Sequence, residues 1–97
     1  MRMMARISIP VEAGNRGIIE GTLPKVVQEF TERWKPEAAY FTAFEGRRTV
    51  FAVFDMADSS VMPAFSEPFF SQFNAEVEFM PVMNVDDLQK GLSELSR

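Results

Sequence analysis

The residues best suited to chemistry lie in short alternating runs that predict β-strands. Arg6 lies at the centre of one such run, and a guanidinium on a covered sheet face needs an acidic partner or an anionic ligand. Glu76 and Glu78 lie two residues apart on the last run, so both point to one side, and Asp55 is a third candidate partner. Arg6 is therefore either an anchor for the carboxylate or phosphate of a ligand, or half of a structural ion pair, which is the more common arrangement.

A second set of residues suggests a pocket with aromatic walls and a few hydroxyl groups. Ser8, Tyr40, Thr42 and Phe51 fall on the same predicted sheet face as Arg6. Pockets for small molecules combine apolar walls with a few placed polar groups. The same residues would equally serve ordinary packing against a partner, with their hydroxyls satisfied, so both interpretations stay open.

Side chains typical of catalysis and metal binding are scarce. The chain has no histidine and no cysteine, which removes an imidazole base, a proximal haem histidine, a thiol nucleophile and a thiolate metal site. General acid–base chemistry by Glu76 and Glu78 would need burial to raise the pKa of one carboxyl. Asp86 and Asp87 are adjacent, face different ways, and are typical of a helix start. We therefore expect neither a metal nor a cofactor, and no catalytic residue stands out.

Three segments supply the strands that must position these residues. Met3–Val11 and Glu76–Met83 alternate between two faces, and Ala38–Met56 is predicted to be a β-hairpin around a turn that contains glycine. With Gly46-Arg47 as a two-residue loop, the predicted pairs are Ala39 with Phe54, Phe41 with Ala52, and Ala43 with Val50. A slip of one residue would exchange the faces of one strand.

Helical periodicity fills the segments between the strands. Asn15 is predicted to cap a first helix, in which Gly21 and Pro24 either introduce a kink or separate two helices. Asp58-Ser59 begins the next helix, and a break is predicted near Pro68, because proline cannot continue the hydrogen-bond ladder.

The order of elements is β-α-β-β-α-β, followed by a terminal helix that Asn84 caps. Right-handed crossovers give an α+β ferredoxin-like antiparallel sheet of order 4-1-3-2, with both main helices on one face, in a single domain over residues 1–97. The other face collects more apolar side chains than a monomer usually exposes. A second copy or the terminal helix must cover it, so a homodimer is expected. Whether the terminal helix packs on its own subunit or on the partner stays open.

Composition and charge exclude several classes of protein. The 97 residues are 46% hydrophobic and include ten phenylalanines, so a real core is expected. The net charge is −4 and the basic residues are scattered, which argues against a nucleic-acid partner. No apolar run approaches the roughly 20 residues of a membrane span, and the N-terminus does not resemble a signal peptide. We expect a soluble, cytoplasmic protein.

Two stretches carry a resemblance to a known group of proteins. The segments KPEAAYFTAFEGRRTVFAVFDM and NAEVEFMPVMNVDDLQKGL, with EPFF between them, resemble a family of small bacterial proteins of unknown function. That family is similar to the dimeric α+β barrel superfamily. The resemblance implies a homodimer whose two sheets face each other around a central cavity. Members of the superfamily include cofactor-independent monooxygenases, haem-degrading enzymes, lactone isomerases and ligand-sensing domains, but no catalytic motif of theirs maps onto this chain.

Three hypotheses of function follow. The first is a homodimer that binds a small apolar or amphipathic molecule between its two sheets, next to Arg6 and the residues named with it. The second is a cofactor-independent enzyme of monooxygenase or isomerase type, with Arg6 and Tyr40 as its polar groups. The third is a non-enzymatic interaction or regulatory module that uses an exposed strand edge or the terminal helix.

Overall fold

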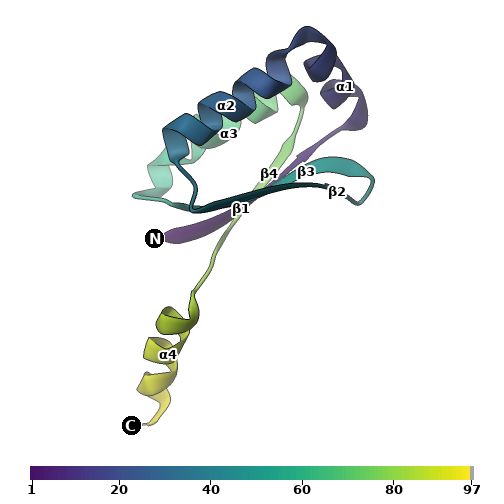
Figure 1. Ribbon diagram of the computed structural model, residues 1–97. Helices are drawn as coiled ribbons and strands as arrows, with labels where there is room; N and C mark the ends of the chain where they lie inside the picture. Colours follow the sequence, from purple (N-terminus) through teal and green to yellow (C-terminus); the bar gives the residue numbers. More distant parts are fainter. Residues whose placement is uncertain (97) are drawn as a thin grey trace.

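Four antiparallel strands form a single sheet in the computed structural model, which describes residues 1–96 (Figure 1). The strands are β1 (Arg2–Ile9), β2 (Ala38–Phe44), β3 (Arg47–Asp55) and β4 (Glu76–Pro81). Their order across the sheet is β2-β3-β1-β4, which is the predicted order read from the other edge. The α+β ferredoxin-like architecture predicted from the sequence is confirmed.

The helices lie on one side of this sheet, with one exception. They are α1 (Val11–Glu20), α2 (Thr22–Trp34), α3 (Met62–Phe73) and α4 (Val85–Ser93), with short 3-10 turns at Ser59–Val61 and Glu94–Ser96. Figure 1 shows α2 and α3 side by side over the sheet, whereas α4 projects away from the rest of the domain. Within residues 1–96, no helix is long and apolar enough to cross a lipid bilayer.

The core fills the space between the sheet and its helices. Alternate residues of β1 and β3 are buried there, and phenylalanines of α2 and α3 pack onto them. The Phe54 and Phe65 rings stack with their centroids 4.6 Å apart, and Phe30 meets the edge of Phe65 at 5.2 Å. Because one face of each strand is used up in this core, the intervening residues must point to the opposite face.

The first helical region consists of two helices. Gly21 ends α1 in the left-handed conformation, with φ of 78°, and α2 begins directly afterwards with Pro24 in its first turn. Of the two predicted alternatives, the separation into two helices is therefore correct. The prediction that Asn15 caps the first helix is wrong. Pro10 precedes the helix, its carbonyl accepts from the Gly14 amide at 2.9 Å, and Asn15 lies inside α1.

The predicted break at Pro68 is also wrong, because α3 runs without interruption through this residue. Proline removes one backbone hydrogen bond from the ladder. Phe65, Phe69 and Phe73 flank Pro68 and are all buried. Burial of this apolar stripe holds the helix together, since packing contributes more to helix stability than local propensity does.

The hairpin turn lies one residue earlier than predicted. Glu45 and Gly46 form the loop, with φ of 54° and 76°, which is the pattern of a type I′ turn. The observed pairs are Ala39 with Ala52, Phe41 with Val50, and Ala43 with Arg48. This change moves each pairing by two residues, so every side chain keeps the face assigned to it.

Candidate functional site

One face of the sheet has no helix of residues 1–96 packed against it, and we call it the open face. Its members alternate with the buried strand residues and come from all four strands. They include Arg2, Met4, Arg6, Ser8, Tyr40, Thr42, Phe44, Arg47, Thr49, Phe51, Val53, Glu76, Glu78 and Met80. All seven residues predicted to bind a ligand belong to this set.

The strand register gathers these seven residues into two adjacent rows that cross the sheet. The first row is Tyr40, Phe51, Arg6 and Glu78, and the second is Thr42, Thr49, Ser8 and Glu76. A third row, Val53, Met4 and Met80, lies next to the first on the side away from the hydroxyls. Across the open face, the side chains therefore change from apolar in the third row, through aromatic and charged in the first row, to hydroxyl-bearing in the second row.

Arg6 lies in the middle of the first row and is held from three sides. Its Nε donates to Glu78 Oε1 at 2.9 Å, and its Nη2 contacts the same oxygen. Glu45 Oε2 lies 4.0 Å from Arg6 Nη1, and the guanidinium carbon is 5.6 Å from the centre of the Phe44 ring. The hydrogen bond to Glu78 raises the pKa of Arg6, so the guanidinium stays charged.

A second ion pair lies at the hydroxyl row. Arg47 Nη1 lies 3.2 Å from Glu76 Oε2, so the pair reaches from β3 to β4 across β1. Ser8 and Thr49 lie opposite each other on β1 and β3 and are buried, and Thr49 is only 2% exposed. The Thr49 hydroxyl donates to the Arg47 carbonyl at 3.1 Å. The Arg47–Glu76 pair therefore borders the part of the open face in which these two hydroxyls lie.

Aromatic and aliphatic side chains dominate the remaining part of the open face. Tyr40 is 70% exposed, and Phe44 and Met80 are also exposed. Phe44 meets the edge of Phe51 with ring centres 5.6 Å apart. A monomer rarely presents so many large apolar groups together unless they serve an interaction.

The two glutamates are arranged for ion pairing. Glu76 and Glu78 point the same way, as predicted, but each faces an arginine. Sequence reasoning did not single out Glu45 and Arg47 because it assigned both to the turn. Among residues 1–96, no three histidine, cysteine, aspartate or glutamate side chains converge as metal ligands would.

Comparison with known proteins places this arrangement in a family. No curated protein matches the chain. A family model described as a domain of unknown function, DUF3303, matches residues 1–96. The match covers all four strands of the open face together with α4, and the chain therefore belongs to the DUF3303 family.

Proposed function

We propose that two copies of this chain pack open face to open face and bind a small amphipathic molecule between their sheets. One observation carries the proposal. The row with Arg6 and the row with the hydroxyls lie next to an apolar row, and all three rows are on the open face of the sheet. The resemblance to dimeric α+β barrels supports the same arrangement, because their cavity lies between two facing sheets.

The energetics favour a partner on this face. Removing several hundred Å² of apolar surface from water stabilises an assembly by on the order of 10 kcal/mol before ordering costs, at roughly 25 cal/mol per Å². Stable protein interfaces bury about 800 Å² on each partner, which is the scale of a small sheet face. Both charged pairs on the face are already formed within one subunit, so a partner does not have to neutralise an isolated charge.

The chemistry of the rows defines the class of ligand. Tyr40 and Phe51 offer aromatic surface, and Met4 and Met80 extend it. Arg6 is the cation at the centre, and an acidic or carbonyl group could take over one of the hydrogen bonds that it gives to Glu78. The ligand is therefore an amphipathic molecule whose polar end reaches Arg6 while its apolar part lies on the aromatic and methionine side chains.

Native mass spectrometry of the purified protein tests this proposal. We expect a dimer that carries additional mass from a co-purified small molecule, and an Arg6→Met variant that remains dimeric but loses that mass. Glu78→Gln is the matched control, because it removes the partner of Arg6 but keeps the cation. A dimer without bound mass, which also takes up no amphipathic carboxylate when one is added, would contradict the ligand site.

A further inference from the structure

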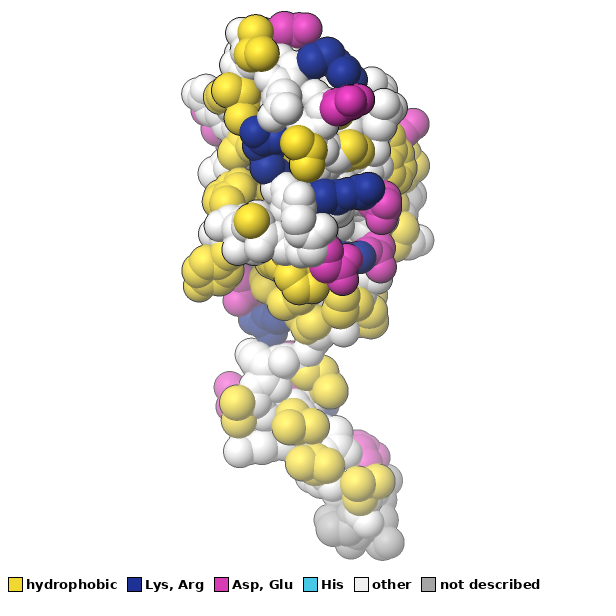
Figure 2. Space-filling model, turned by 90° about the vertical axis from the view of Figure 1, so that its right-hand side faces the viewer, with side chains coloured by type: hydrophobic (Ala, Val, Ile, Leu, Met, Phe, Trp, Pro, Cys, Tyr) yellow, Lys and Arg dark blue, Asp and Glu magenta, His cyan; other side chains and the backbone are white. Residues whose placement is uncertain are grey.

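Helix α4 and the 3-10 turn that follows it carry a narrow apolar stripe that stays exposed within the described residues 1–96. Val85, Leu88, Leu92 and Leu95 are spaced by three, four and three residues, and their exposed fractions run from 44% to 77%. Figure 2 shows hydrophobic side chains in a line along this projecting helix. A stripe with this spacing is the seam of helix-on-helix packing, whereas a helix that lies on a sheet needs a broader apolar face.

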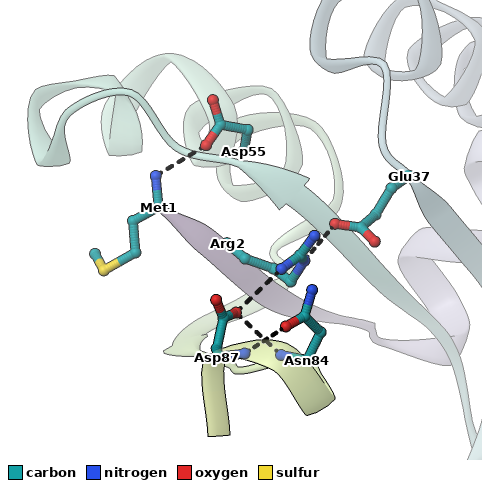
Figure 3. A network of polar contacts seen from close by, with 6 residues as sticks. All are labelled: Met1, Arg2, Glu37, Asp55, Asn84 and Asp87. Atoms are coloured by element: carbon teal, nitrogen blue, oxygen red, sulfur yellow. Dashed lines mark hydrogen bonds and ion pairs between the residues drawn. The ribbon is translucent and has the colours of Figure 1, made fainter. Parts of the chain in front are cut away.

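The base of α4 is fixed on the open-face side of the sheet (Figure 3). Arg2 alternates with the buried Met3, so it shares a face with Met4 and Arg6. Its Nη1 lies 3.2 Å from Asp87 Oδ2 in the first turn of α4, and its Nε lies 2.6 Å from Glu37 Oε1. The hydrogen bond to Glu37 is the main cause that raises the pKa of Arg2. A copy that covers the open face therefore lies beside α4.

Helix α4 is too short to be stable in water without packing against another surface. Isolated helices shorter than about 12 residues are marginal in water, and α4 has nine. Asn84 and Asp87 do cap it reciprocally, with the Asp87 amide 2.8 Å from Asn84 Oδ1 and the Asn84 amide 3.1 Å from Asp87 Oδ2. A capping box sets where the helix begins, but it leaves the leucine stripe in water.

A matching surface lies along the opposite side of the same subunit, between α3 and β4. This groove, which we call the α3–β4 groove, measures about 390 Å³ and is lined by Met62, Pro63, Ser66, Glu67, Phe70, Val77 and Phe79. Met62, Ser66 and Phe70 follow one another at intervals of four residues, which forms a ridge on α3 for another helix to pack against. Phe70 is 42% exposed in the described part of the chain, so the groove offers an apolar side chain to a partner.

We propose that α4 of each copy docks in the α3–β4 groove of the other copy, an inference that rests on the sheet-to-sheet dimer proposed above. Its own groove is on the helix side of the sheet, whereas Arg2 holds α4 on the open side. Packed sheets lie about 10 Å apart, and the linker with α4 extends roughly 20 Å, which is enough to pass the edge of the partner sheet. A two-fold axis makes the exchange reciprocal and leaves neither stripe nor groove uncovered.

Cysteine cross-linking tests this docking directly, because the chain has no cysteine of its own. One chain carries Leu92→Cys, and a second chain, which a tag makes longer, carries Glu67→Cys. The two chains are mixed, unfolded and refolded together. A short bismaleimide cross-linker is then added. We expect a product that joins the two chains, and we expect none from Lys90→Cys with Glu67→Cys, since Lys90 lies on the opposite side of α4.

Three outcomes would overturn the inference. A product between two Leu92→Cys chains would show that α4 pairs with α4. A further sample is a single chain that carries both Leu92→Cys and Glu67→Cys. A cross-link within that chain would show that α4 folds back on its own subunit. No product would show that α4 docks elsewhere. Light scattering on the same samples separates the two proposals, because a dimer without the cross-link contradicts only the docking of α4, whereas a monomer contradicts the sheet-to-sheet dimer as well.

A second variant gives the same answer without a cross-linker. Leu88→Asp should raise the dimer dissociation constant roughly tenfold or more, because it places a charge in an apolar groove. Gln89→Asp is the control beside it. An equal effect of the two variants would contradict docking through the leucine stripe.

Discussion

At the scale of single residues, the arrangement of the open face depends on which acidic side chain forms an ion pair with which arginine. Three acids were candidate partners of Arg6 in the sequence, and the register between β1 and β4 decides among them. Glu78 lies directly opposite Arg6 on β4, whereas Asp55 lies beside Arg2 and binds the amino-terminal nitrogen of Met1 at 2.8 Å. Alternation in the sequence was enough to predict the face of each residue, and the order of elements was enough to predict which strands are neighbours, but the register between β1 and β4 was not readable from it.

The burial of Thr49 and Ser8 shows the same limit. Both were expected on the open face, where a hydroxyl is normally wet. They are buried nonetheless, and the ion pair near them, between Arg47 on β3 and Glu76 on β4, exists only once β3, β1 and β4 are neighbours. Local pattern therefore predicts where a side chain points, while its accessibility depends on contacts between segments far apart in the chain.

One residue-scale prediction concerns pH. The Asp58 side chain accepts from the Ser60 amide at 2.8 Å, and this hydrogen bond lowers the pKa of Asp58 below its ordinary value of 3.8. A lowered pKa means that the folded state favours the carboxylate, so this contribution to stability is present above pH 3.8 and is lost as the pH falls through the folded pKa. Urea unfolding between pH 5 and pH 2.5, for the wild type and Asp58→Asn, measures it. The wild type should lose more stability than the variant over this range, and equal losses would contradict the capping role.

At the scale of elements, the hairpin shows what a short sequence signal can and cannot specify. A glycine between two apolar runs was enough to predict a hairpin and the face of each of its strands. It was not enough to place the loop, because Gly46 fits either position of a two-residue turn. The observed loop requires Glu45 to adopt a positive φ, which is uncommon for a glutamate, so the sequence alone does not suggest it. The twist of the two strands favours the type I′ turn and overrides that local preference.

Substitution of Gly46 tests this turn. Gly46→Ala places a Cβ at φ of 76° and should lower the free energy of unfolding by about 1 kcal/mol, because L-residues are strained there. Gly46→Asn is the matched control and should cost less, since asparagine tolerates this region better than alanine. The free energies are measured by urea unfolding at neutral pH. Equal costs for the two variants would place the strain elsewhere than in the turn.

At the scale of the whole molecule, the domain leaves two apolar surfaces uncovered. One is the open face and the other is the stripe of α4, and Arg2 joins them because its side chain lies on the first and binds the base of the second. The fold class followed from the order of the elements, and the expectation of a partner followed from counting apolar residues on the open face. The direction of α4 could not be predicted from the sequence, because it depends on the contacts of Arg2 with Glu37 and Asp87, which bring three distant segments together.

The central claim is that a second copy covers the open face, and the molar mass in solution tests it most directly. Size-exclusion chromatography with light scattering should give about 22 kDa for the wild type at micromolar concentration, twice the 11.0 kDa of one chain. Phe51→Glu, which puts a charge in the middle of the open face, should give a folded monomer, while Ile19→Glu on the exposed surface of α1 should remain a dimer. A wild type of 11.0 kDa, or a dimer that survives Phe51→Glu unchanged, would contradict the claim.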